Sequence, residues 1–297
     1  MPRHLLLVPL ALLAASAIAG DAPAYREEVE AWRRKRADGL KAEDGWLSVA
    51  GLYWLKPGET TLGADAANDI VLPDGAPPSL GTVELRSDGG AAFRAASGVG
   101  ATLNGKPVQT CELRSDTDGA KADVLAFGRM KLILLKRGSR HALRLKDNDA
   151  RTRADFHGLN WFPIVEKWRL EAAYTPDPTP RPVVFETIVG EPDVARSAGT
   201  VSFEVDGKPC SLQAVDSGGQ LWFVFRDATA GKQTAAGARQ LTAERPAQLG
   251  DPVILDFNKA ANLPCAYIIH ATCPLAPPQN RLKVAIPAGE QLYGPQR

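Results

Sequence analysis

Short apolar runs separated by turn-forming residues fill most of the chain, and this pattern restricts the possible fold more than any other feature. The runs at 47–55, 70–72, 82–85 and 91–94 are each bounded by Gly, Pro, Asn or Asp. Strand-length runs at this spacing are typical of β-sandwiches. Similar runs continue from 168 to 225, so the sequence predicts a protein that is mainly β in both halves.

Two dipeptides predict tight hairpins within this pattern. They are Asn104-Gly105 and Asp206-Gly207. A type I′ turn needs positive φ at both central positions, which Asn, Asp and Gly tolerate better than other residues. The runs 131–136 and 141–145 predict a third hairpin.

One short helix is expected, near the N-terminus. Tyr25, Val29 and Trp32 recur at helical spacing, and Gly39 is a plausible end of the helix. The basic residues at 33–36 suit the negative end of the helix dipole. We interpret them as a solvated last turn.

The first nineteen residues have the pattern of an export signal. Arg3 and His4 precede an uncharged apolar run at 5–19, which ends in Ala-Ile-Ala. The run is shorter than the ~20 residues that span a bilayer, and small residues suit signal peptidase. We therefore expect cleavage after Ala19 and a periplasmic or secreted protein that is not an integral membrane protein after cleavage.

Length and net charge set two further limits. The chain has 297 residues, more than one ordinary hydrophobic core, so two domains are expected. The formal net charge of +1 at pH 7 provides no broad positive field. We therefore expect no nucleic-acid partner.

The segments 62–73 and 102–108 resemble the forkhead-associated domain, a β-sandwich that binds phosphothreonine. In that family an Arg follows the Gly of the first strand, and a Ser-Arg-x-His-like segment comes later. Here Ala64 stands at the first position, and Leu80 follows Ser79. Phosphate capture needs a bidentate donor. The resemblance therefore implies the fold, and we expect no phosphopeptide recognition.

A second resemblance extends over nearly all of the chain after the signal. It is carried by Asp-Asn-Asp at 147–149, His-Gly-Leu-Asn-Trp-Phe-Pro at 157–163, Phe-Arg-Asp-Ala-Thr at 225–229, Gly-Lys-Gln-Thr at 231–234 and the run 255–282. On these motifs the chain is identified as a member of the DUF1684 family, whose most specific stretch here is 256–290. The resemblance implies no particular activity.

The export signal, the helix pattern and the two resemblances together imply a four-part organisation of the chain. We expect a signal peptide at 1–19, a helix and lead-in at 20–44, a forkhead-associated-like β-sandwich at 45–146 and a C-terminal β-rich domain at 147–297.

Polar side chains gather between residues 227 and 281, and we interpret them as a binding site for a polar small molecule or a cell-envelope component. Glycines allow close approach of a ligand to the backbone, and Lys and Arg can hold an anion. The candidate binding residues are Asp227, Lys232, Arg239, Asp256, Asn258, His270, Asn280 and Arg281. The alternative is a structural or interaction protein, in which these groups satisfy buried backbone groups.

Cys265, His270 and Cys273 admit three interpretations. After export the two cysteines could form a disulfide. Two thiolates and an imidazole could bind zinc, although the spacing matches no zinc pattern. His270 could be a general base oriented by Asp256, or Cys265 a nucleophile, which would make the protein a hydrolase, although neither lies in a known nucleophile motif. We expect no metal and no cofactor, and catalytic residues are not assigned.

Aromatic residues flank the expected junction between the halves. Core packing is their ordinary role, but a cleft between domains that they lined would suit an apolar ligand. They are Trp46, Tyr53, Trp54, Trp161, Phe162 and Trp168.

Overall fold

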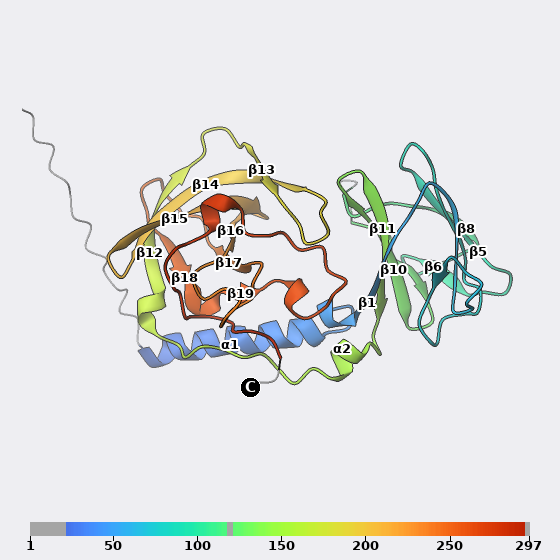
Figure 1. Ribbon diagram of the computed structural model, residues 1–297, viewed down its shortest axis with the longest axis horizontal. Coiled ribbons are helices and arrows are strands. Elements are labelled where there is room, and N and C mark those ends of the chain that lie inside the picture. The colour runs from blue at the N-terminus through green and yellow to red at the C-terminus, as the bar shows by residue number, and fades with distance from the viewer. Residues whose placement is uncertain (1–21, 118–120, 295–297) are drawn as a thin grey trace, which may run out of the picture.

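The computed structural model describes residues 22–117 and 121–294. The predicted signal peptide at 1–19 lies outside the described residues. The structure is mainly β, as the sequence predicts, and has two β units with one long helix (Figure 1).

The first unit is a β-sandwich of two sheets. The six-stranded sheet contains, in spatial order, β1 (Val49–Trp54), β11 (Arg140–Asp147), β10 (Met130–Arg137), β9 (Leu125–Phe127), β6 (Ala101–Leu103) and β7 (Lys106–Val108). The five-stranded sheet contains β3 (Ile70–Val71), β2 (Gly58–Gly63), β4 (Gly81–Leu85), β5 (Ala91–Ala95) and β8 (Thr110–Leu113). Side chains of both sheets, such as Phe93 and Leu132, form one buried core between them.

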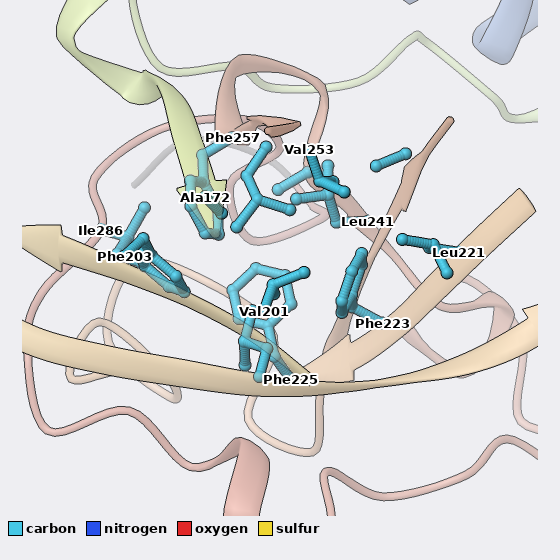
Figure 2. Close-up of a cluster of buried hydrophobic side chains, with 14 of the residues drawn as sticks. Ala172, Val201, Phe203, Leu221, Phe223, Phe225, Leu241, Val253, Phe257 and Ile286 are labelled. Atoms are coloured by element: carbon cyan, nitrogen blue, oxygen red, sulfur yellow. The ribbon is translucent and has the colours of Figure 1, made fainter. Parts of the chain in front are cut away.

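The second unit is built on an eight-stranded antiparallel sheet. Its order is β18 (Val253–Asp256), β12 (Arg169–Pro176), β14 (Asp193–Val205), β15 (Lys208–Ser217), β16 (Gln220–Phe225), β17 (Arg239–Ala243) and β19 (Ala261–Asn262), with β13 (Pro182–Phe185) paired to β14. Its core includes Phe203 and Phe225, whose ring centroids lie 5.7 and 5.5 Å from that of Phe257 (Figure 2). Phe257 therefore anchors the segment that follows β18 in the middle of this core.

The predicted hairpin turns at Asn104-Gly105 and Asp206-Gly207 are both present. They connect β6 to β7 and β14 to β15. All four residues have positive φ, between 48° and 82°. This is the backbone that a type I′ turn requires.

The helices are few, and the long one belongs to the second unit. They are α1 (Ala22–Lys41), α2 (Arg151–Ala154) and the short 3₁₀ helices η1 (Trp46–Ser48), η2 (Glu166–Trp168), η3 (Phe257–Lys259), η4 (Pro264–Ala266) and η5 (Pro278–Asn280). In Figure 1, α1, in blue, runs along one side of the second unit. Tyr25 and Val29 are buried with Ile164 on that side.

The predicted end of this helix was wrong by one half-turn. The helix passes through Gly39 and ends at Lys41. Leu40 is only 5% exposed because it packs in a core cluster with Leu47 and Ile268. That cluster joins α1, the start of the sandwich and the second unit, so burial of Leu40 stabilises the additional residues of the helix.

Candidate functional site

Asp227 and Arg239 form a buried ion pair in the second unit. Asp227 follows β16 and Arg239 begins β17, and their side chains are 0% and 1% exposed, with a 2.6 Å contact between Oδ2 and Nη2. The other carboxylate oxygen accepts hydrogen bonds from Thr229 and from the backbone N–H of Ile286. Arg239 also donates to the carbonyl oxygens of Ile286 and Ala288. The pair connects the chain near residue 287 to the β16–β17 turn and faces no solvent.

Asp256 and Asn258 hold the N-terminal helix instead of facing a ligand space. The Tyr25 hydroxyl donates to Asp256 Oδ1 at 2.8 Å, and Asn258 Nδ2 donates to the same hydroxyl at 2.9 Å. Asn258 also exchanges hydrogen bonds with the backbone of Val165. Lys259 extends the contact by pairing with Glu28 of α1. Burial, and then Asp256, raises the pKa of Tyr25 above its ordinary value, which keeps its hydroxyl a donor.

Asn280 has a similar internal role. Its side-chain oxygen accepts from the N–H of Gln213 at 2.7 Å, and its amide donates to the carbonyl oxygens of Gln213 and Val224. It is 1% exposed and ties β15 to β16. Arg281 is exposed and donates to the carbonyl oxygen of Ala276.

Of the remaining two predicted residues, Lys232 is exposed at the turn after Gly231 and His270 lines a cavity. The structure therefore does not bring the eight residues together around one hollow. Asp227, Arg239, Asn258 and Asn280 are buried tethers, and their hydrogen bonds go to this chain's own groups.

A second buried network was missed by the sequence analysis. Arg36 of α1 donates to Glu290 at 3.1 Å and to the hydroxyl of Tyr267 at 3.0 Å, and it also bonds the carbonyl oxygen of Asn262. Glu290, which is 1% exposed, accepts from Tyr267 and from both the backbone and the side chain of Asn262. Burial, and then the carboxylate of Glu290, raises the pKa of Tyr267.

The sequence predicts that the basic residues at 33–36 form a solvated last turn, but they lie before the last turn of α1, which ends at Lys41. They are not all solvated. Arg36 is used in this network, and Arg33 donates to the carbonyl oxygen of Asn258 and covers the ring of Trp161 at 4.6 Å. Arg34 and Lys35 are exposed. Half of the cluster thus faces the second unit, because α1 packs against that unit on the same face.

Cys265, which lies in η4, and Cys273 are neighbours at the two ends of the segment 265–273, here called the excursion. Both are free thiols in the structure. The backbone N–H of Cys265 lies 3.2 Å from the sulfur of Cys273. The contact between the thiols lowers the pKa of Cys265 and, together with burial, raises that of Cys273. A disulfide between them stays a prediction.

His270 lies at the tip of this excursion, at the junction of the two units. It lines a cavity of about 570 Å³ together with Ile268 and Ile269 from the excursion and with Asp74, Arg129, Asp147, Asp149 and Arg151 from the sandwich and the segment after it. Ile269 is 89% exposed at this cavity. Burial lowers the pKa of His270, so the neutral imidazole is favoured. This cavity is the candidate functional site.

The cations and anions of this junction cavity partly neutralise each other. Arg129 contacts Asp147 at 2.8 Å and Asp149 at 3.2 Å, and its second terminal nitrogen also donates to the carbonyl oxygen of Asp74. Arg151, which begins α2, is exposed. The cavity therefore offers hydrogen-bond donors and acceptors without a strong field of one sign.

The catalytic pair that the sequence suggested is not formed. Asp256 bonds Tyr25 and Asn258, and its second oxygen lies 3.5 Å from Lys259. Within residues 22–117 and 121–294, no hydrogen bond joins Asp256 to His270. The 3₁₀ helix η3 turns Asp256 toward α1, whereas His270 follows η4 at the junction.

In the described part of the chain, no group of three or more His, Cys, Asp or Glu residues is arranged to hold a metal ion. Nor does any helix among these residues have the length and apolar character needed to cross a membrane.

The aromatic residues predicted at the junction do not line one common cleft. Trp168 and Phe162 are buried, Trp54 is covered by Arg140 at 3.8 Å, and Trp161 packs edge-on against Trp32. Trp46 does line a cavity, of about 330 Å³, but this cavity is separate from the junction cavity.

Comparisons with known proteins give one family match and several similar solved structures. The profile of the family described as "Protein of unknown function (DUF1684)" matches residues 154–291. A solution structure of an uncharacterized protein of Haloarcula marismortui has 37% sequence identity, covers 47% of this chain and 78% of its own, and has a TM-score of 0.40. The chain belongs to the DUF1684 family.

Forkhead-associated domains are also among the similar solved structures. The FhaA domain, solved with the intracellular domain of Rv3910, has 18% identity, covers 32% of this chain and 97% of its own, and has a TM-score of 0.23. A domain from a study of phosphothreonine-dependent interactions has 18% identity, covers 32% of this chain and 92% of its own, and has a TM-score of 0.23. No curated protein matches the chain.

Proposed function

We propose that this protein is an exported, non-catalytic binding protein that takes a neutral, hydroxyl- or amide-bearing small molecule, such as a saccharide fragment of the cell envelope, in the junction cavity. The observation that carries the proposal is the lining of this cavity, which comes from both units and includes His270. Its volume of about 570 Å³ falls within the roughly 300–1,000 Å³ of small-molecule sites.

The charges of the cavity favour an uncharged ligand. Arg129 is balanced by Asp147 and Asp149, so it offers hydrogen bonds more than net charge. The neutral imidazole of His270 can donate through one nitrogen and accept through the other. Ile269, which is 89% exposed, gives the apolar surface against which the carbon framework of such a ligand can pack.

Binding without turnover is proposed because, among the residues that the structure describes, no carboxylate is hydrogen-bonded to His270. A general base needs its partner within hydrogen-bond reach, and Asp256 is bonded elsewhere. We also propose that phosphothreonine peptides do not bind, because Ala64 and Leu80 replace the donors that capture phosphate in forkhead-associated domains.

Export is proposed from residues 1–19 alone. Expression of the full chain in a bacterial host and mass measurement of the periplasmic protein test it. Loss of residues 1–19 supports export, and a protein that retains Met1 in the cytoplasm contradicts it.

The binding proposal is tested by titrating the mature protein with a panel of neutral mono- and disaccharides and N-acetylated amino sugars. Binding is followed by thermal unfolding and by two-dimensional NMR, and the NMR signals of the sugar itself report any turnover. The variants are His270→Ala and Arg151→Ala in the cavity, with Lys232→Ala as the matched exposed control.

Saturable binding that weakens at least tenfold in His270→Ala and is unchanged in Lys232→Ala is the expected result. Tenfold corresponds to about 1.4 kcal/mol, the range of one or two hydrogen bonds. Failure of every sugar to bind, or equal binding by His270→Ala, contradicts the proposal. Chemical conversion of a bound sugar would show an enzyme.

A further inference from the structure

A second cavity lies over the outer face of the six-stranded sheet and shares no lining residue with the junction cavity. Its volume is about 330 Å³. The cavity is lined by Ile133 and Leu135 of β10, by Arg144 and Lys146 of β11, and by Trp46 of η1. Lys121 also lines the cavity, which therefore combines an apolar surface with three cations.

Arg144 is buried in this cavity without an anionic partner. It is 8% exposed, and in the described part of the chain no carboxylate lies within ion-pair distance of it. Its guanidinium sits over the ring of Trp46 at 5.0 Å and donates a long, 3.4 Å hydrogen bond to the hydroxyl of Thr272. Its Nε has no partner. A buried charge with so little compensation is costly to a fold.

The other charges of the cavity do not neutralise Arg144. Lys146 donates to the backbone carbonyl oxygen of Asp44, not to a carboxylate. The two lining carboxylates have cations of their own, since Asp44 pairs with Lys131 and Asp116 with Arg137 at 2.7 Å. An excess of positive charge therefore remains at Arg144 and Lys146.

Arg144 stays charged in this position. Burial, with the like charge of Arg137 as the next cause, lowers its pKa to about 10. At neutral pH the guanidinium is still protonated, so the cavity presents a permanent cation.

We propose that this cavity binds a small organic carboxylate, with the carboxylate on Arg144 and Lys146 and the apolar body against Ile133, Leu135 and Trp46. The fork of a guanidinium matches a carboxylate in a bidentate way. The apolar lining distinguishes such a ligand from inorganic anions, which have nothing to place there. The site is independent of the junction cavity and of the ligand proposed for it.

The experiment titrates the mature protein with sodium benzoate and sodium hexanoate at constant ionic strength, by calorimetry and thermal unfolding. Benzamide serves as the uncharged probe and inorganic phosphate as the anion without an apolar body. The variant is Arg144→Met. The matched control is Arg140→Met, on the same strand but stacked on Trp54 outside the cavity.

The expected result is that a carboxylate binds the wild type and the Arg140→Met variant with equal affinity, and binds Arg144→Met at least tenfold more weakly. Unliganded Arg144→Met should unfold at the same temperature as the wild type or higher, because an unpaired buried charge has been removed. If Arg144→Met does not fold, Lys146→Met tests the proposal instead. Its affinity for the carboxylate must then be at least threefold weaker than that of the wild type.

Three results would overturn the proposal. The first is that neither carboxylate binds the wild type at millimolar concentration. The second is that both carboxylates bind Arg144→Met as tightly as they bind the wild type. The third is that phosphate or benzamide binds as tightly as the carboxylates, because the cavity would then not select a carboxylate with an apolar body.

Discussion

The hydroxyl of Tyr25 donates a 2.8 Å hydrogen bond to the carboxylate of Asp256, which joins the N-terminal helix to the family signature across 231 positions of sequence. Asn258 donates to the same hydroxyl. The matched family region at 154–291 therefore folds here around a helix that lies outside it. Asp256 and Asn258 of the signature therefore form the surface to which α1 is hydrogen-bonded.

The first prediction concerns this hydroxyl. Tyr25→Phe removes two hydrogen bonds, although Asp256 Oδ1 keeps the N–H of Asn258 and Asn258 Nδ2 keeps the carbonyl oxygen of Val165. A hydrogen bond to a charged group contributes about 1.5–3 kcal/mol and a neutral one about 0.5–1.5 kcal/mol, so the free energy of unfolding should fall by about 2–4 kcal/mol. Urea denaturation measures it, with the exposed Arg34→Gln on the same helix as the control. Equal stability of Tyr25→Phe and the wild type would show that the contact is dispensable.

The second prediction concerns the buried pair Asp227 and Arg239. Asp227→Asn leaves Arg239 without its counter-charge, at a cost of about 3–5 kcal/mol. The double variant Asp227→Leu with Arg239→Met should be more stable than Asp227→Asn, because no buried charge remains. Thermal unfolding of the three proteins decides this. A double variant that is the least stable of them contradicts the account of this pair.

The folded architecture could be predicted from the sequence where local chemistry decides it. Asn104-Gly105 and Asp206-Gly207 predict their turns because positive φ is a property of those residues themselves. The end of α1 could not be predicted in this way. Leu40 is buried by residues far away in sequence, and that tertiary contact outweighs the helix-ending tendency of Gly39.

The site was harder to predict for a related reason. Polar residues that gather in sequence can face a ligand or each other, and only the packing decides which. Arg36 pairs with Glu290, 254 positions away, so no local pattern names the partner. A signal for the helix was nevertheless present. Arg33 and Arg36 follow Val29 by four and seven positions, which places them on its buried face.

The third prediction concerns the cysteines at the ends of the excursion. In an oxidising compartment Cys265 and Cys273 should form a disulfide, because their thiols are already in contact. Mass spectrometry of the periplasmic protein should then find the two cysteines linked in one peptide. The bond should stabilise the fold by about 2–3 kcal/mol relative to the reduced protein. Two free thiols in the exported protein would show that Cys265 and Cys273 do not form a disulfide.

The fourth prediction concerns pH. Burial lowers the pKa of His270 in the folded state, below the ordinary value of about 6.5. As pH falls from 6.5 toward this lowered pKa, the unfolded state binds more protons and the free energy of unfolding decreases. His270→Gln should lose this part of the dependence, whereas His157→Gln, at an exposed position, should keep it. Identical pH profiles for His270→Gln and the wild type contradict the burial effect.

The most direct test of the central claim is the equilibrium unfolding of Asn258→Ala in urea. Asn258 was predicted to bind a ligand, and the structure instead gives its side chain three internal hydrogen bonds. The account predicts that Asn258→Ala loses about 2–4 kcal/mol of unfolding free energy, while the exposed Lys232→Ala changes by less than about 0.5 kcal/mol. If the Asn258→Ala protein is as stable as the wild type, the account is contradicted, because Asn258 would then not stabilise the packing of α1 against the signature.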